Sequence, residues 1–283
     1  MRVGVVGRRP PEVGERWQLQ PRDFHRDSEG RPLGHALVGP VAVRCARPGT
    51  VLEVWIDEVR AGARGWTWAG GWWSVLGERL RLPDLDGHLL EWELDGAAGV
   101  ARDGKGREVA LRPFLGILGM PPDEPGKHST MPPRTTGGNI DCKELVEGST
   151  LLLPIDVEGA LLSAGDGHAA QGDGEVGQMA IECPLERVQL TLSVREDLTL
   201  VTPCALTPTA WIAFRFDEDL DEAVVHALNG MLDLMDRELG LERKEALAFA
   251  SVVVDLRVTQ VVNRVRGVHA RLALSALERL RLA

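Results

Sequence analysis

The residues Gly148-Ser-Thr-Leu-Leu-Leu-Pro-Ile-Asp-Val157 lead directly into Gly159-Ala-Leu-Leu-Ser-Ala-Gly-Asp-Gly-His-Ala-Ala-Gln-Gly-Asp-Gly-Glu-Val176. The first segment is largely apolar, which is typical of a buried strand. The second contains three carboxylates, an imidazole, a carboxamide and several glycines. Glycine lets the backbone turn tightly and approach a small ligand, whereas Asp, His and Glu bind metals or transfer protons. We therefore expect a strand that leads into a loop carrying the functional site.

A second polar and glycine-rich cluster lies upstream of that strand. The connection at residues 122–136 is rich in Pro, Gly and Thr and has too little apolar content for a core segment. Long loops of this kind in compact domains are often functional. The connection ends in Gly137-Gly-Asn-Ile-Asp141. We expect Asp141 to belong to the same site as the loop at residues 159–176.

The N-terminal half contains segments in which apolar and polar residues alternate. In residues 51–59, Leu52, Val54 and Ile56 point one way and the intervening side chains the other, as in a half-buried strand. Asp-Gly and Gly-rich turns separate further alternating segments, which indicates an antiparallel meander. Other strand-like segments are expected at residues 15–23, 80–82, 89–94, 188–194, 198–201 and 211–216.

The pattern becomes helical towards the C-terminus. Asp219-Leu-Asp-Glu222 resembles a capping box, and apolar residues then recur at helical spacing until Gly240 ends the run. Residues 242–254 are predicted to form a second helix, and residues 256–265 return to a strand-like pattern. The sequence therefore predicts an α+β fold that is mainly β. Its antiparallel sheets would form a barrel-like or sandwich core, with a smaller C-terminal α/β portion containing two helices.

We divide the chain into three expected parts, which together form one intertwined catalytic unit. Residues 1–125 are the N-terminal mainly-β part, and residues 126–205 are the central β part that carries the site motifs. Residues 206–283 are the C-terminal α/β part. A core of this size needs no cross-links. The four cysteines, Cys45, Cys142, Cys183 and Cys204, are scattered through the chain and are expected to be free thiols.

Charge and composition exclude several classes of partner. The net charge is −10 and the isoelectric point is about 5.3, which opposes binding to nucleic acid or to an anionic membrane. Hydrophobic residues make up 44% of the chain and charged residues 26%, as in an ordinary globular protein. No apolar run is long enough to span a membrane, and residues 1–11 lack the features of a signal peptide. We expect a cytoplasmic protein.

Three other kinds of site fit the sequence poorly. Prolines at positions 10 and 11 oppose the helix that a dinucleotide-binding loop at residues 4–7 would need. Ser163 has Leu161 where a nucleophile elbow needs glycine. Cys142 has charged neighbours, but neighbours on an extended chain point in different directions, so a passive thiol is favoured. The tryptophans within residues 62–73 either cover the core or form a wall over a ligand or subunit contact.

The polar residues of the loop are spaced in pairs. His168 follows Asp166 by two positions, and Glu175 follows Asp173 by two, so each pair would project to one side of an extended segment. Two carboxylates on one buried face shift each other's pKa or recruit a cation. Mixed oxygen and nitrogen ligands suit a divalent metal. Asp-Gly is also a common turn sequence, so a simple turn at Asp166 or Asp173 stays open.

Several motifs together resemble one known family. Gly138-Asn-Ile-Asp141, residues 153–176 and Ala180-Ile-Glu182 look like the signature of the acetamidase/formamidase family. Similar motifs are His35-Ala-Leu-Val-Gly-Pro40, Ala46-Arg-Pro-Gly49, Pro113-Phe-Leu-Gly-Ile-Leu-Gly119 and Ser251-Val-Val-Val-Asp-Leu-Arg-Val-Thr-Gln-Val-Val-Asn263. The resemblance covers nearly the whole chain. It implies a mostly β fold, hydrolysis of formamide- or acetamide-like amides to carboxylate and ammonia, and homo-oligomers (dimer or higher).

The resemblance also implies which residues line the site. These are Asp141, His168 and Glu175, joined by Asp23 and His35 from the N-terminal half. A divalent metal, zinc or calcium, bound through Asp141 and His168 would polarise the carbonyl group and acidify bound water. Asp23 and His35 are further candidate ligands. No organic cofactor is expected.

Chemical roles follow from what amide hydrolysis requires. Glu175 is our candidate general base and acid. Gly138 and Asn139 are placed to donate to the oxyanion, and Gln171 and Asp173 to contact the substrate. Two alternatives stay open. One is a non-catalytic metal- or small-carboxylate-binding protein that retains the fold, which the short N-terminal segment favours. The other is a hydrolase of a larger amide.

Overall fold

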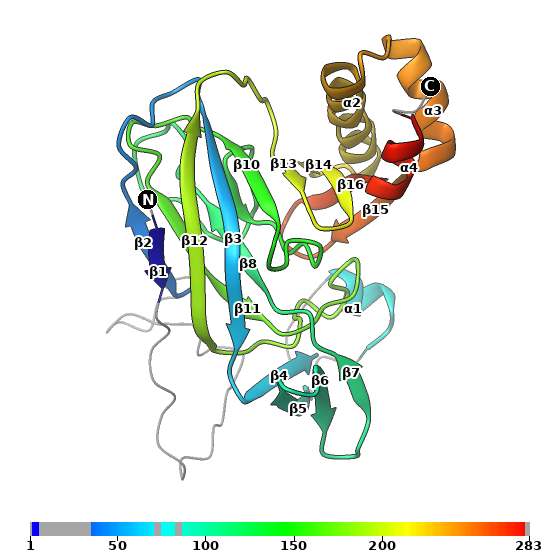
Figure 1. Cartoon of the computed structure of the whole chain (residues 1–283). Coiled ribbons are helices and arrows are strands. Elements are labelled where there is room, and N and C mark those ends of the chain that lie inside the picture. The colour runs from blue at the N-terminus through cyan, green and yellow to red at the C-terminus, as the bar shows by residue number, and fades with distance from the viewer. Residues whose placement is uncertain (1, 6–34, 71–74, 83–86, 281–283) are drawn as a thin grey trace.

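In this computed structural model of the chain, the described residues are 2–5, 35–70, 75–82 and 87–280. These residues form three antiparallel sheets and four helices (Figure 1). The largest sheet has eight strands and extends across the molecule. In spatial order its strands are β1 (Arg2–Val5), β12 (Leu185–Arg195), β3 (Val51–Ala61), β10 (Thr150–Pro154), β13 (Cys204–Leu206), β14 (Ala210–Asp217), β16 (Arg266–Ala273) and β15 (Val254–Gln260).

A second sheet of four strands lies against the large one. Its order is β2 (Leu37–Val41), β11 (Leu162–His168), β8 (Phe114–Gly119) and β9 (Gly137–Asn139). Apolar side chains from both sheets form one core, in which Leu52 on β3, Leu118 on β8 and Leu151 on β10 are fully buried. All six residues of β8 are buried, because this strand lies between the partner strands β11 and β9 and faces the core.

The third sheet covers the segments that follow β11. Its order is β4 (Arg64–Ala69), β5 (His88–Asp95), β6 (Val100–Asp103) and β7 (Glu108–Ala110). Trp92 and Leu94 of β5 pack with Ala169, Ala170 and Ile181, which belong to those segments. Figure 1 shows this sheet at the lower end of the molecule, beside the short helix α1 (Val75–Arg79).

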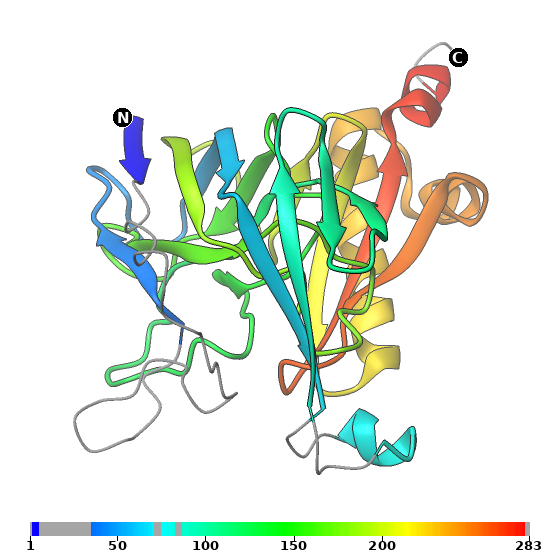
Figure 2. The ribbon, with the colours of Figure 1, turned by 90° about the horizontal axis from the view of Figure 1, so that it is seen from below.

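Helices cover one face of the C-terminal strands. Helix α2 (Leu220–Leu239) packs its buried residues, among them Met231 and Met235, on β14 and β16, and α3 (Arg243–Val253) and α4 (Leu274–Leu280) lie beside it. Figure 2 shows α2 running along this side of the sheet. Within the part of the chain that the structure describes, no helix is both long and apolar enough to cross a membrane.

The local signals predicted the C-terminal helices well. The side chain of Asp219 accepts a hydrogen bond from the backbone N–H of Asp221, and Gly240 ends α2 in the left-handed conformation, with φ of 67°. The fold is α+β and mainly β, as expected, and the sheets that the described residues form do not close into a barrel. The large sheet draws strands from all three expected parts of the chain.

Several predicted elements differ from the structure. Residues 162–168, expected within a loop, form strand β11 in the centre of the second sheet. Residues 80–82 and 198–201 are not strands; Leu80 and Leu82 are exposed, so their alternation faces no core. The last predicted strand, 256–265, spans Val254–Gln260 and then turns. The predicted strand at residues 15–23, Trp72 and Trp73 lie outside the described residues.

All four cysteines are free, as expected. Burial raises the pKa of Cys142 to about 12, so its thiol remains protonated at neutral pH. This favours the passive interpretation of Cys142 over an activated nucleophile.

Candidate active site

One buried cluster brings together five ionisable side chains from separate segments. Ligand-type atoms of Asp141, Asp166 and His168 all lie within 4.8 Å of one another, and so do those of His168, Glu175 and Glu182. His168 belongs to both groups and is therefore the centre of the cluster. Asp141 follows β9, whereas Asp166 and His168 end β11.

The backbone pairing of β11 explains why these segments meet. His168 pairs with Phe114 on β8 and forms an isolated bridge with Glu182. Asp141 is held against β8, because its N–H donates to the carbonyl oxygen of Gly116. Small residues on β11 allow close packing. A Cβ on Gly167 would lie 2.5 Å from the carbonyl oxygen of Cys183.

The imidazole of His168 is almost fully buried and is held from both sides. Its Nε2 lies 3.4 Å from Oδ2 of Asp166 and 3.4 Å from Oε2 of Glu182. Its Nδ1 lies 3.0 Å from Oε1 of Gln171, whose Nε2 donates to the carbonyl oxygen of Asp141 at 2.7 Å. Because that second bond fixes the orientation of the Gln171 amide, Nδ1 is the donor to Oε1. Nε2 is the ring nitrogen that faces the carboxylates.

Charge and burial act against each other at His168. Burial alone lowers the pKa of the imidazole, but the negative charges of Glu182 and Asp166 outweigh it and raise the pKa well above its usual value. The ring of Phe114 meets the imidazole edge-on, with centroids 5.0 Å apart. The cluster therefore stabilises positive charge at Nε2, whether carried by a proton or by a bound cation.

Within the cluster, Asp141 and Glu175 are the two carboxylates with raised pKa values. Burial and then the charge of Glu175 raise the pKa of Asp141 well above its usual value, although His168 opposes this. Burial raises the pKa of Glu175 to about 7, while His168 again acts in the opposite direction. A carboxyl group with a pKa near 7 is suited to accept and return a proton at neutral pH.

Asp166 shifts in the other direction. Burial alone raises its pKa, but the charge of His168 and a hydrogen bond with it outweigh burial, so the pKa is lowered. The nearby charge of His35 contributes to the same lowering. Carboxylates whose pKa values are pushed apart in one site commonly divide acid–base and electrostatic roles between them.

Three of the acids are in a strained backbone conformation. The φ angles are 51° at Asp141, 61° at Asp166 and 44° at Glu175, all in the left-handed region that non-glycine residues rarely adopt. Each such residue costs about 1–3 kcal/mol, and such residues cluster at functional sites. The concentration of strain at these acids indicates that their positions serve binding or chemistry rather than stability.

The side chains of Asp141, Asp166 and His168 approach Gly116 closely, and we call the narrow space that its missing side chain leaves to them the Gly116 hollow. A Cβ at this position would lie 2.7 Å from Oδ2 of Asp166, 2.8 Å from Oδ1 of Asp141 and 2.8 Å from Cε1 of His168. Oδ1 of Asp141 and Oε2 of Glu175 are buried without a hydrogen-bond partner. Burial of a carboxylate oxygen without a hydrogen-bond partner destabilises the folded protein. Binding of a proton or a cation would remove this destabilisation. The donor set fits a divalent metal, and its imidazole favours zinc over calcium.

The structure places the other predicted residues as follows. Gln171 joins His168 to Asp141, as described above. Gly138 and Asn139 lie on β9, where Nδ2 of Asn139 donates to the carbonyl oxygen of Met131 at 3.1 Å. His35 bonds to the Thr130 hydroxyl at 2.8 Å and is near enough to affect Asp166. Asp23 lies outside the described residues.

Asp173 lies away from the cluster, beside Lys143. Its Oδ2 lies 3.1 Å from Nζ of Lys143 and 3.8 Å from Nη1 of Arg257. The prediction that Asp173 and Glu175 project to one side is wrong, because the segment is not extended. Gly174 and Glu175 both have positive φ, 92° and 44°, and this turn separates the two side chains.

Four residues of the site were not among the site residues that the sequence assigned. Asp166 and Glu182 contact His168, Gly116 leaves the hollow, and Asn263 donates to Asp141. The two-residue spacing of Asp166 and His168 was a usable signal. No spacing rule connects Glu182, Gly116 or Asn263 to the cluster, although all three lie within motifs that resemble the family.

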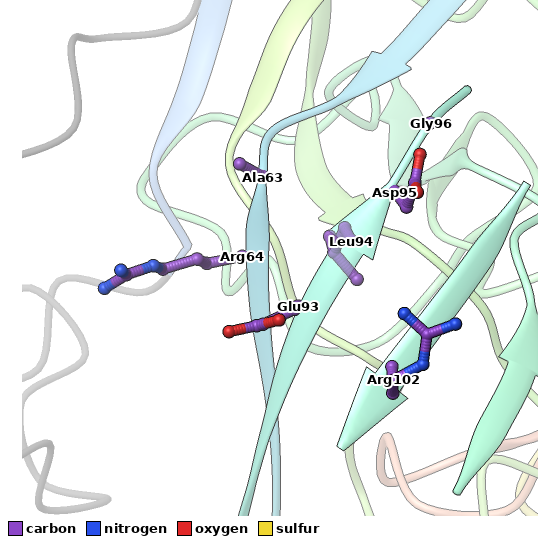
Figure 3. Close-up of a pocket in the computed structure, with 7 residues that line it drawn as sticks. All are labelled: Ala63, Arg64, Glu93, Leu94, Asp95, Gly96 and Arg102. Atoms are coloured by element: carbon purple, nitrogen blue, oxygen red, sulfur yellow. The ribbon is translucent and has the colours of Figure 1, made fainter. Parts of the chain in front are cut away.

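An open surface hollow lies away from the buried cluster. A cavity of about 430 Å³ on the third sheet is lined by Arg64, Glu93, Arg102 and their neighbours (Figure 3). It shares no residue with the buried cluster, and Arg102 already pairs with Glu108. The strained and electrostatically coupled acids, not this open hollow, therefore mark the candidate active site.

Comparison with known proteins agrees with these features. The acetamidase of Mycolicibacterium smegmatis is 55% identical over 47 residues, a match that spans 17% of this chain and 12% of that protein. The solved acetamidase of Bacillus halodurans has a TM-score of 0.76 and 33% identity, covering 85% of this chain and 79% of its own. A predicted acetamidase/formamidase from Thermoanaerobacter tengcongensis has a TM-score of 0.76 and 28% identity, covering 86% and 78%.

The match to a protein family is broader than the match to the curated acetamidase. Residues 124–275, more than half of the chain, match the profile of the Acetamidase/Formamidase family. These residues include every acid of the cluster, as well as His168 and Asn263. The chain therefore belongs to the Acetamidase/Formamidase family.

Proposed function

We propose that this protein hydrolyses short-chain linear amides of the formamide and acetamide type to a carboxylate and ammonia. The observation that carries the proposal is Glu175, a buried acid whose pKa is raised to about 7, beside an unpartnered oxygen of Asp141. Family membership and the names of the relatives support the same chemistry.

Glu175 is the proposed general base and acid. It removes a proton from water as the water oxygen bonds to the amide carbon, and it then protonates the nitrogen as the C–N bond breaks. The products are the carboxylic acid, which ionises, and ammonia. Its pKa near 7 supports both steps, since the group can take up and release a proton at neutral pH.

Asp141, Asp166 and His168 are the proposed holders of a zinc ion, which would supply Lewis acidity for the amide carbonyl. Their ligand atoms lie within 4.8 Å of one another around the Gly116 hollow. Gln171 orients His168 by accepting from Nδ1, so that Nε2 faces the acids. Glu182 also lies 3.4 Å from Nε2 and adds negative charge on the side opposite to Gln171.

Amides of different size distinguish the proposed substrate class from larger amides. The test is ammonia release from formamide, acetamide, propionamide and a cyclic amide, before and after chelation and after addition of zinc. Turnover of formamide or acetamide that falls on chelation and returns with zinc is the expected result.

Other outcomes of this panel would redirect the proposal. Turnover of the cyclic amide alone would identify a hydrolase of larger amides. Indifference to chelation would remove zinc from the account. No turnover of any amide, together with stoichiometric zinc by elemental analysis, would leave a metal-binding protein that retains the fold.

A further inference from the structure

Asn263 makes a direct side-chain contact with the Asp141 carboxylate. Its Nδ2 donates to Oδ2 of Asp141 at 2.5 Å, although the two residues are 122 positions apart in the chain. Both residues are buried, with 6% and 1% exposure. A hydrogen bond to a buried carboxylate is stronger than one between neutral groups. Because it fixes Oδ2, it also fixes where Oδ1 points, and Oδ1 borders the Gly116 hollow.

Gln260 holds the backbone of Asn263 in place. Its Oε1 accepts from the N–H groups of Val262 at 2.9 Å and Asn263 at 3.0 Å. Gln260 is fully buried at the end of β15, and its side chain closes the turn that follows the strand. The position of the Asn263 amide is therefore set by the end of β15 and not by a free loop.

The same strand end also binds the backbone next to Glu175. The N–H of Gly174 donates to the carbonyl oxygen of Thr259 at 3.1 Å, and the N–H of Val261 donates to the carbonyl oxygen of Gly174 at 3.1 Å. These two bonds form a parallel bridge between Gly174 and Gln260. Glu175 directly follows the bridged residue, so its strained backbone is tied to the same turn.

Charged groups add a second tie between this loop and β15. Asp173 lies 3.8 Å from Nη1 of Arg257 on β15 and 3.1 Å from Nζ of Lys143. Arg257 also donates to the buried carboxylate of Glu144 at 3.1 Å. The segments that carry Asp141 and Glu175 are thus both connected to β15.

We propose that Gln260 and Asn263, in the turn at the end of β15, are positioning residues that set the placement of Asp141 relative to Glu175. The proposal rests on the function proposed above, in which these two acids act at one site. Pre-placed polar groups raise reaction rates because little reorganisation is needed during the reaction. A contact that only stabilised the fold would not need to end on the carboxylate oxygen of a strained acid.

The test compares Asn263→Ala and Asn263→Ser with wild-type protein, using Thr202→Val as the control. Thr202 is buried and donates to the carbonyl oxygen of Phe214, so its loss also removes a buried hydrogen bond. It lies in the segment before β13 and contacts none of the acids. Three quantities are measured for each protein: kcat and KM for acetamide, zinc affinity by titration calorimetry, and Tm.

For Asn263→Ala we expect kcat and zinc affinity to fall by about 10- to 100-fold, the range found when groups that orient metal ligands are removed. KM stays within about twofold if the lost contact acts on chemistry and not on substrate binding. Asn263→Ser keeps a donor and recovers part of both losses. Thr202→Val lowers Tm by a similar amount without these losses. If Thr202→Val loses as much kcat and zinc affinity as Asn263→Ala for the same fall in Tm, the proposal is overturned.

A crystal structure of the Asn263→Ala protein gives a readout that depends on neither turnover nor zinc. The expected result is an Asp141 carboxylate turned out of its wild-type position at the Gly116 hollow. An unchanged carboxylate would overturn the positioning role, even in a protein that hydrolyses amides. Conversely, a displaced carboxylate in a chain whose wild type turns over no amide would uphold the positioning role while the proposed function fails.

Discussion

Asp141 and Glu175 each keep one buried carboxylate oxygen without a hydrogen-bond partner, and burial together with the charge of Glu175 raises the pKa of Asp141. Two such groups are unfavourable together unless they bind a proton or a cation. The fold maintains the pair through positive φ angles at both residues and through the turn at the end of β15. The strained backbone and the unpartnered oxygens lower the stability of the fold, which indicates that this pair of acids serves a chemical role.

Metal-free protein should lose stability as pH rises. Glu175 binds its proton more tightly in the folded state, with a pKa of about 7 against 4.5, so the folded form is favoured at low pH. This contribution, of the order of 3 kcal/mol, is lost between pH 4.5 and 7. The raised pKa values of Asp141 and His168 also make the folded protein more stable at low pH. The contribution of His168 to stability is fully present below pH 6.5 and is lost as pH rises through the pKa of the folded state.

Urea unfolding of chelated protein from pH 5 to pH 8 measures this effect. The free energy of unfolding should decline across that range, and the decline should be shallower in Glu175→Gln. A free energy of unfolding that increases with pH would show that the acids are not buried in protonated form.

Substitution of Gly116 by alanine should close the hollow. The new Cβ would lie within 2.8 Å of Oδ2 of Asp166, Oδ1 of Asp141 and Cε1 of His168, so at least one of them must move. We expect amide turnover and zinc affinity to fall by about 100-fold or more, since small displacements in a site are costly. Gly104→Ala is the matched control, because no atom lies within 4 Å of its added Cβ. Equal activity of the two variants would show that the close packing of these side chains at Gly116 is not needed for turnover.

Loss of Gln171 should weaken the site through His168. Gln171→Ala removes the acceptor for Nδ1 and the donor to the carbonyl oxygen of Asp141. Groups that orient metal-binding histidines contribute about 10- to 100-fold in metal affinity or activity. Zinc titration and kcat measurements should show a loss of this size. A change confined to KM would instead assign Gln171 to substrate binding.

Asp173→Asn separates two roles for this residue. If Asp173 ties the Glu175 loop to Lys143 and Arg257, kcat should fall by roughly a few fold with KM unchanged, because partly exposed ion pairs contribute about 1 kcal/mol or less. If Asp173 binds the substrate, KM should rise instead. Initial rates over a range of acetamide concentrations distinguish the two.

Local sequence signals predicted those parts of the fold that depend on near neighbours. Asp219 and Gly240 marked the ends of α2, and the alternation of Leu52, Val54 and Ile56 marked the buried face of β3. The sequence did not predict the strand β11, because its small residues have no local preference for a strand. Their close packing against β2 and β8 explains them, and only the fold shows that packing.

The candidate site was predictable in its residue types but not in its geometry. The density of ligand-type groups and the resemblance to a family pointed to Asp141, His168 and Glu175, which the structure brings together. Glu182 reaches His168 through an isolated bridge between the end of β11 and the segment before β12, which no local pattern predicts. Asp173 was placed on the wrong side because a two-residue period holds only for extended backbone, and positive φ breaks it here.

The central claim is that Glu175 transfers the proton in amide hydrolysis. Its most direct test is ammonia release from acetamide by wild-type protein, Glu175→Gln and Glu158→Gln at pH 8, with zinc bound and thermal stability measured in parallel. Glu158 is exposed and outside the cluster, so the same change of charge there should leave turnover intact. The account predicts a folded Glu175→Gln protein whose kcat is lower by about 100- to 10,000-fold, and turnover equal to wild type in that protein would contradict it.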